Sequence, residues 1–117
     1  MSESKLRTQS MDFAVSIINL VKYLKEKRES IISNQIGRSG TSIGANIREA
    51  NYGQSKADML SKFEIALKEC SETEGWLRLL FNTNAIDEEI YKKHRNLCGR
   101  IRRMLIESCK TLKESIK

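Results

Sequence analysis

The chain has 117 residues, of which 39% are hydrophobic and 31% are charged, with six glycines, three cysteines, no proline and a net charge of +6. This length favours one domain with a modest core, and the mixture of apolar and charged residues excludes an intrinsically disordered chain. No run of about 18 uncharged apolar residues is present, which excludes a transmembrane helix. The odd number of cysteines forms no Cys-x-x-Cys pair, so we expect no disulfide framework and a cytoplasmic location.

Apolar residues recur with a period near 3.6 in four segments, and the absence of proline favours long uninterrupted helices. No segment alternates with a period of two for long, so we expect no sheet. Short connections between amphipathic helices predict an all-α, up-down-up-down antiparallel four-helix bundle that forms a single domain over residues 1–117. The expected helices cover about residues 10–27, 31–51, 56–82 and 88–115.

The joints between these helices carry residues that begin or end helices. Gly53 can take the left-handed conformation that closes the second helix. Ser55 and Asp87 are expected N-caps of the third and fourth helices. The joint near Glu29 and Ser30 has neither glycine nor proline and is the least defined of the three.

Gly37, Gly40 and Gly44 form a stripe beside the isoleucines of the second helix. Each glycine costs about 1 kcal/mol relative to alanine inside a helix. A phosphate cradle would be one reason for them, but their spacing matches no phosphate-binding loop. We therefore expect another helix to approach the backbone closely here.

A set of polar residues lies on one flank of the second helix. On the third helix, Glu74 falls inside the apolar stripe. A carboxylate in that position needs a partner, for which Arg38 and Asn46 are candidates. An acid–base site is one interpretation, but no nucleophile–base–orienter set accompanies it, so we expect no catalytic residue and no enzyme activity. We interpret the set as a structural polar network that fixes helix register. It comprises Gln35, Arg38, Ser42, Asn46, Glu49 and Glu74.

His94 and Cys98 lie one turn apart on the apolar side of the fourth helix. Such a pair could be half of a metal site, but no second pair occurs at a suitable spacing. No defined partner for His94 is evident from the sequence. We therefore expect a packed histidine, buried thiols, no metal and no cofactor.

Apolar side chains also lie away from the core faces of the first and third helices. A monomer would leave this surface, which includes a tryptophan, exposed to water. Scattered surface hydrophobic residues are the alternative, but the regular spacing favours a subunit interface. The expected interface residues are Val15, Ile18, Ile65, Trp76 and Leu79.

The fourth helix carries most of the excess charge, since residues 90–117 have a net charge of +7 and residues 57–89 a net charge of −5. Its cations project into a sector about 100° wide that also contains Gly99, with Tyr91 as the only aromatic residue at its edge. A line of cations is typical of a protein that binds nucleic-acid phosphates without reading sequence. A membrane surface is less suitable, because the apolar face of this helix is needed for the core. We call these cations the basic ridge: Lys92, Arg95, Arg102, Arg103, Lys110 and Lys113.

The sequence of residues 35–50 resembles that of the family of 23S ribosomal RNA intervening-sequence proteins. The family pattern runs Gln, two residues, Arg-Ser, two residues, Ser-Ile, two residues, Asn-Ile, one residue, Glu-Gly. The final glycine is Ala50 here, and a stretch that resembles the family's third helix begins at Gln54. The matching residues are Gln35, Arg38, Ser39, Ser42, Ile43, Asn46, Ile47 and Glu49.

The resemblance implies a four-helix bundle that assembles into a ring-like homopentamer. It also implies similarity to the accessory variability protein of diversity-generating retroelements, which binds nucleic acid and a reverse transcriptase. Our leading hypothesis is therefore a non-enzymatic, oligomeric bundle that binds the RNA or DNA backbone through the basic ridge. The alternative is a protein–protein scaffold or an accessory subunit of a nucleic-acid enzyme.

Overall fold

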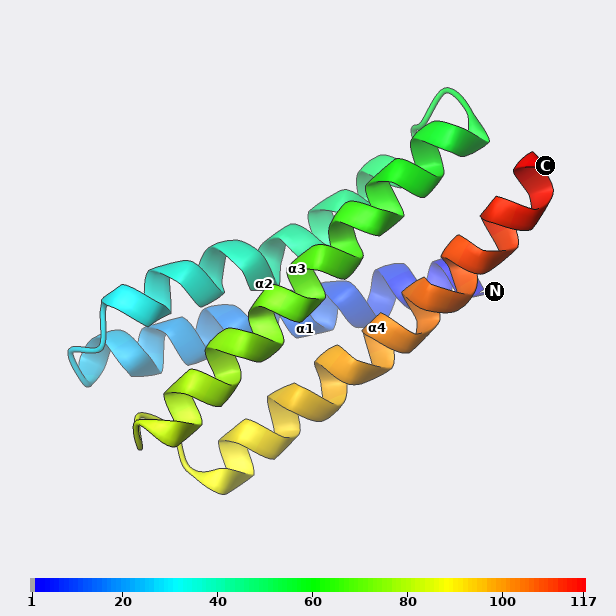
Figure 1. The fold of residues 1–117 in the computed structure, drawn as a ribbon. Coiled ribbons are helices and arrows are strands. Elements are labelled where there is room, and N and C mark those ends of the chain that lie inside the picture. The colour runs from blue at the N-terminus through cyan, green and yellow to red at the C-terminus, as the bar shows by residue number, and fades with distance from the viewer. Residues whose placement is uncertain (1) are drawn as a thin grey trace.

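The computed structural model describes residues 2–117, with side chains from Lys5 onward, and over this range the chain forms four α-helices and no strand (Figure 1). The predicted all-α fold with four helices is confirmed. No helix in the described range is both long and apolar enough to span a membrane. The helices are α1 (Ser2–Glu26), α2 (Ile31–Ala50), α3 (Lys56–Asn82) and α4 (Glu88–Ile116).

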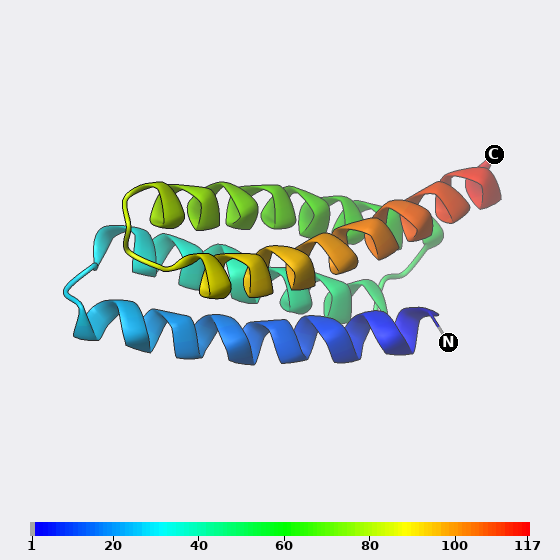
Figure 2. The ribbon, with the colours of Figure 1, turned by 90° about the horizontal axis from the view of Figure 1, so that it is seen from below.

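The four helices follow one another around the bundle in chain order. Each packs against the next, and α4 packs against α1 to close the bundle, while the diagonal pairs α1–α3 and α2–α4 do not pack together. The α1–α4 contact is the least extensive of the four. The carboxyl end of α4 rises away from α1 and stays beside α3 (Figure 2).

The start of α1 lies earlier than the prediction near residue 10. Leu6 and Ser10 are both fully buried and continue the inward face that Phe13 and Ile17 form. A serine in the core position interrupts the apolar pattern, which is why sequence periodicity alone placed the start too late.

The core consists of the inward faces of all four helices. Near the end of α3, Leu80 is fully buried, whereas Phe81 is only half-buried. The ring of Phe81 instead stacks on that of Tyr91, with centroids 4.7 Å apart. Tyr91 adjoins the basic ridge as predicted, since Arg95 lies over its ring, but it is buried. The largest fully buried side chains are Leu6, Phe13, Ile17, Leu24, Ile36, Ile43, Ile47, Phe63, Leu77, Leu80, Ile101 and Leu105.

The glycine stripe of α2 faces α1, which confirms the predicted close approach. A Cβ added at Gly40 would lie 2.8 Å from Cγ1 and 2.9 Å from Cγ2 of Ile17. A Cβ at Gly37 would lie 3.2 Å from Val21, and one at Gly44 would lie 3.3 Å from the Ser10 hydroxyl. Only a residue without a side chain allows α1 and α2 to pack at this separation.

Two of the predicted caps are confirmed. The Ser55 hydroxyl accepts a hydrogen bond from the Asp58 amide at 3.1 Å, and the Asp87 carboxylate accepts one from the Ile90 amide at 2.8 Å. Both bonds satisfy amide groups that have no partner within the first turn of a helix.

The prediction for Gly53 was wrong, because this residue does not adopt a left-handed conformation and α2 ends in a right-handed turn at Asn51. The left-handed residues are Arg28, with φ of 65°, and Asn84, with φ of 62°. They lie in the α1–α2 and α3–α4 joints. After Arg28, the Glu29 carboxylate caps α2 by accepting hydrogen bonds from the amides of residues 32 and 33.

Replacing Gly40 by valine should destabilise the bundle, because the added methyl groups would collide with Ile17. Overpacking costs about 1–3 kcal/mol, which exceeds the gain of less than about 1 kcal/mol from removing a helical glycine. Urea-induced unfolding measures the difference.

Gly75→Ala on α3 is the matched control, since a Cβ there meets no atom within 4 Å. That variant should be more stable than the parent by about 0.5–1 kcal/mol. A Gly40→Val protein as stable as the parent would contradict the close approach of α1 and α2.

Candidate functional site

All six residues of the basic ridge lie on the outward side of α4, where five are exposed and Arg102 is half-buried. Carboxylates pair with three of them. Glu88 lies 3.1 Å from Lys92 on the same helix, whereas Glu74 and Glu64 of α3 lie 3.2 Å from Arg102 and 3.5 Å from Lys113. The ridge cations that have no carboxylate partner among the described side chains are Arg95, Arg103 and Lys110.

A shallow hollow lies in the ridge above Gly99 and spans about 380 Å³. The terminal guanidinium nitrogens Nη1 of Arg103 and Nη2 of Arg102 lie 3.6 and 3.9 Å from the position of a Cβ at Gly99. An oxygen of Glu74 lies 4.0 Å from the same point. Two guanidinium groups therefore converge on one point, with one carboxylate beside them. The hollow is lined by Glu74, Arg95, Asn96, Gly99, Arg100, Arg102 and Arg103.

Arg100 was missed by the sequence analysis. It projects about 60° outside the predicted sector of the ridge, yet it lines the same hollow because it directly follows Gly99. Adjacency to a small residue among cations was the signal that could have identified it. Arg95, in contrast, was predicted, and its guanidinium lies over the Tyr91 ring at 5.3 Å from the centroid.

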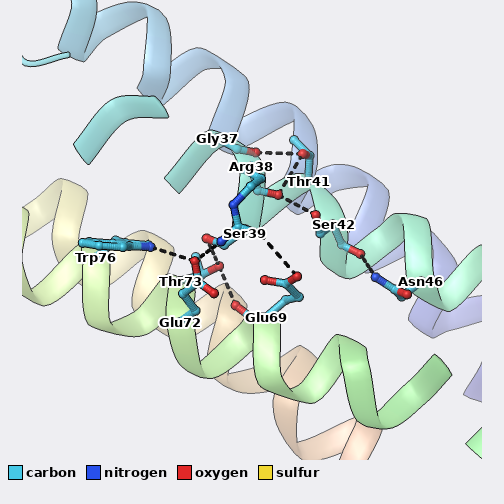
Figure 3. A network of polar contacts seen from close by, with 10 residues as sticks. All are labelled: Gly37, Arg38, Ser39, Thr41, Ser42, Asn46, Glu69, Glu72, Thr73 and Trp76. Carbon is cyan, nitrogen blue, oxygen red and sulfur yellow. Dashed lines mark hydrogen bonds and ion pairs between the residues drawn. The ribbon is translucent and has the colours of Figure 1, made fainter. Parts of the chain in front are cut away.

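The predicted polar network is divided among separate contacts. The partner of Glu74 is Arg102 on α4, and not Arg38 or Asn46 as predicted. Arg38 reaches from α2 to α3, where it pairs with Glu69 at 3.5 Å and with Glu72. Figure 3 shows this cluster, in which Arg38 points toward Glu69 and Glu72.

The remaining members of the predicted network bond within α2, pair with a residue of α3 or are exposed to solvent. Ser42 donates to the Arg38 carbonyl at 2.7 Å, and Asn46 donates to the Ser42 carbonyl at 2.9 Å. Glu49 pairs with Lys62 at 2.8 Å. Gln35 is exposed and makes no side-chain hydrogen bond to a described residue. The set therefore does not form one connected network.

The buried polar contact between α2 and α3 is one that the sequence analysis did not identify. The hydroxyls of Thr73 and Ser39 are 2.8 Å apart, and both residues are fully buried. The Thr73 hydroxyl donates its proton to the Glu69 carbonyl at 2.7 Å, so it accepts a hydrogen bond from Ser39. Such a pair ties the two helices at one register, because a slip would leave a buried hydroxyl without its partner.

His94 is buried between α4 and α1, and it has two partners where none was predicted. Nδ1 lies 2.8 Å from the Ile90 carbonyl, which can only accept, so Nδ1 carries the proton. Nε2 therefore accepts from the Ser16 hydroxyl of α1 at 2.8 Å. Burial lowers the pKa of His94 from its usual 6.5, so the ring is neutral near pH 7.

The cysteines are buried thiols, as predicted. The Cys98 thiol lies 3.6 Å from the Cys70 carbonyl, and contact with the Cys70 thiol together with burial raises the pKa of Cys98. Desolvation likewise raises the pKa of Cys109. Protonated thiols are poor nucleophiles and poor ligands. Within the described part of the chain, no three His, Cys, Asp or Glu residues are placed to hold a metal ion.

The predicted interface residues fall on two separate surfaces. Val15 and Ile18 are exposed on α1, whereas Ile65 and Leu79 are exposed on α3. Trp76 is half-buried on α3, packs against the core, and donates from Nε1 to Glu72 at 3.2 Å. Because α1 and α3 are diagonal and do not pack together, the predicted residues lie on two separate apolar surfaces, and Trp76 and Leu79 lie side by side on α3.

Fold and surface together define a small antiparallel four-helix bundle with a polycationic outer helix. A model of the 23S rRNA-intervening sequence protein matches residues 2–107, and the chain belongs to that family. This confirms the resemblance seen in the sequence of α2.

The chain is also similar to a solved structure from Bacteroides thetaiotaomicron VPI-5482, described as a protein with unknown function from the S23 ribosomal protein family. The two are 49% identical with a TM-score of 0.93, and the match covers 94% of this chain and 99% of that one. None of the curated proteins compared with the chain matches it. The family therefore establishes the fold and leaves the function to be argued from the surface.

Acidification should destabilise the protein through His94, because the unfolded chain binds a proton at this ring more readily than the folded one. Because burial lowers the folded pKa below 6.5, the contribution of the neutral ring is fully present well above pH 6.5 and is lost as the pH falls through 6.5 towards the folded pKa. Urea unfolding across this range measures the effect.

His94→Gln is the control, since an amide can occupy the site without titrating. The variant should lose that part of the pH dependence. An equal slope in both proteins would show that His94 does not carry the effect.

Proposed function

We propose that this protein is a non-enzymatic, oligomeric bundle that binds the phosphate backbone of RNA or DNA through the basic ridge of α4, in the cytoplasm. The observation that carries the proposal is the set of ridge cations without a carboxylate partner: Arg95, Arg103 and Lys110. Since no carboxylate neutralises these three cations, their charge is available to a ligand.

The placement of the ion pairs supports a surface role for the ridge. Glu74 and Glu64 of α3 engage only Arg102 and Lys113, which lie on the side of the ridge nearest α3. On the other side, Arg103 and Lys110 are exposed and have no carboxylate partner. Positive charge of this kind attracts a polyanion and binds it by releasing counterions.

The ridge offers phosphate contacts and little means of reading bases. Its neighbouring aromatic residue, Tyr91, is buried against Phe81 and cannot stack on a base. Contacts to phosphates position a protein on nucleic acid without specifying sequence. We therefore expect affinity that depends steeply on salt and weakly on sequence.

Self-association is the second part of the proposal. Two different apolar patches, on diagonal helices, suit a head-to-tail contact in which one patch of each subunit meets the other patch of its neighbour. Contacts of this type generate closed rings when the rotation between subunits closes. The family resemblance implies a ring of five subunits. Such a ring would repeat the ridge around its circumference and increase the affinity of the assembly for nucleic acid.

A protein scaffold is the alternative function, and the same exposed apolar residues on α1 and α3 favour it. Its partner would be a nucleic-acid enzyme such as a reverse transcriptase. A monomeric protein that binds no nucleic acid at low salt would favour this alternative over the leading proposal.

Arg103→Glu combined with Lys110→Glu should abolish most nucleic-acid binding while leaving the fold intact, because neither residue pairs with a carboxylate. If both contact phosphates, the slope of log affinity against log salt should fall by about two. A mobility-shift titration at several salt concentrations measures both quantities.

The matched control is Lys22→Glu with Lys25→Glu, which makes the same change of charge on the exposed face of α1. The control protein should bind nearly as the parent does. Equal losses in the two double variants would mean that net charge, and not the ridge, determines binding.

Leu79→Lys should lower the oligomeric mass measured by light scattering, because it places a charge in the apolar patch of α3 without touching the core. Trp76→Ala is less informative alone, since the half-buried indole also packs against the core. Ile31→Lys is the control, because that side chain is 79% exposed and lies outside both patches. A parent protein that is already monomeric would refute the self-association.

A further inference from the structure

We infer that the hollow above Gly99 is a binding site for a phosphomonoester, such as the terminal phosphate of a nucleic-acid strand. This inference rests on the proposed function and adds a ligand group to it. A strand would place its end in the hollow and its diesters along the remaining cations of the ridge.

Positive charge is concentrated in the hollow. Four arginines and one carboxylate line the hollow, so the excess is about three positive charges at one place. A diester carries one negative charge, whereas a monoester carries about −1.5 to −2 near neutral pH. The singly charged phosphodiesters within a strand match the line of cations along the ridge. The more highly charged phosphomonoester at the end of a strand matches the arginine cluster of the hollow.

Two guanidinium groups converge on the hollow. Arg102 and Arg103 both place a terminal nitrogen within 4 Å of the same point above Gly99. Glu74 is the one carboxylate beside these two cations, and a bound phosphate would supply the further negative charge that offsets their repulsion. Guanidinium groups present paired donors that fit the oxygens of a phosphate.

Packing does not require residue 99 to be a glycine. A Cβ there would make only ordinary contacts, at 3.6 Å or more, and no backbone strain favours glycine since φ is not positive. A glycine nevertheless weakens α4 by about 1 kcal/mol relative to alanine. The space that it leaves lies beneath the two guanidinium groups, where the phosphate oxygens would sit.

Glu74 sets the strength of this site. Its carboxylate holds Arg102 at 3.2 Å and lies beside the hollow, so it competes with an incoming phosphate for the same guanidinium. Removing that charge should therefore tighten the binding of a terminal phosphate more than it tightens the binding of an end with a hydroxyl.

The experiment compares oligonucleotides of one sequence that carry a 5′-phosphate, a 3′-phosphate or hydroxyls at both ends, measured by fluorescence anisotropy at low salt. We expect one phosphorylated end to bind about tenfold more tightly than the unphosphorylated strand. Inorganic phosphate should compete for that preference, and the favoured end identifies which terminus enters the hollow.

Gly99→Ala should lose the preference for the terminal phosphate and unfold at higher urea concentration than the parent. Gly75→Ala, the same change on α3, should gain stability and keep the preference. Glu74→Gln should increase the preference. These opposite changes in stability and binding separate a ligand site from a structural effect.

The possible failures are distinguishable. If no strand binds at low salt, the proposed function fails and this inference fails with it. If all three strands bind equally, the ridge stands and the phosphomonoester site is refuted. If Gly99→Ala keeps the preference, the site lies elsewhere on the protein.

Discussion

The close contact between α1 and α2 at Gly40 sets the spacing on which the rest of the bundle depends. Ile17 occupies the place that a side chain at residue 40 would need. The preceding residue, Ser39, points toward α3, where it bonds to Thr73. One turn of α2 thus fixes the distance to α1 and the register of α3.

The register of α3 in turn determines which cations remain free. Its carboxylates reach both neighbours, with Glu69 and Glu72 holding Arg38 of α2, and Glu64 and Glu74 holding two cations of α4. The acidic third helix therefore does more than lower the net charge, since it pairs with two cations of the ridge while three others have no carboxylate partner. The overall +6 describes neither surface.

Helical periodicity and capping chemistry were sufficient to predict four helices, two of the caps and the glycine contact. They failed where a polar residue occupies a core position or a large residue adopts an unusual backbone conformation. Ser10 hid the first turns of α1, and Arg28 turns the chain where glycine would be usual. The partner of Glu74 could not be predicted because a projection of one helix does not say which neighbouring helix faces it. The basic ridge was identifiable because its residues share one helix, whereas the hollow also needs a residue from α3.

The burial of His94 has a consequence for observing this molecule in solution. The chain has one histidine, and its ring bridges the least extensive helix pair through Ser16. Its imidazole resonances are therefore free of overlap from any other histidine and arise from the α1–α4 boundary. A ligand that reaches the ridge only from outside would leave these signals in place, whereas one that separates the helices would shift them. The protein thus contains a built-in spectroscopic reporter that distinguishes surface docking from opening of the bundle.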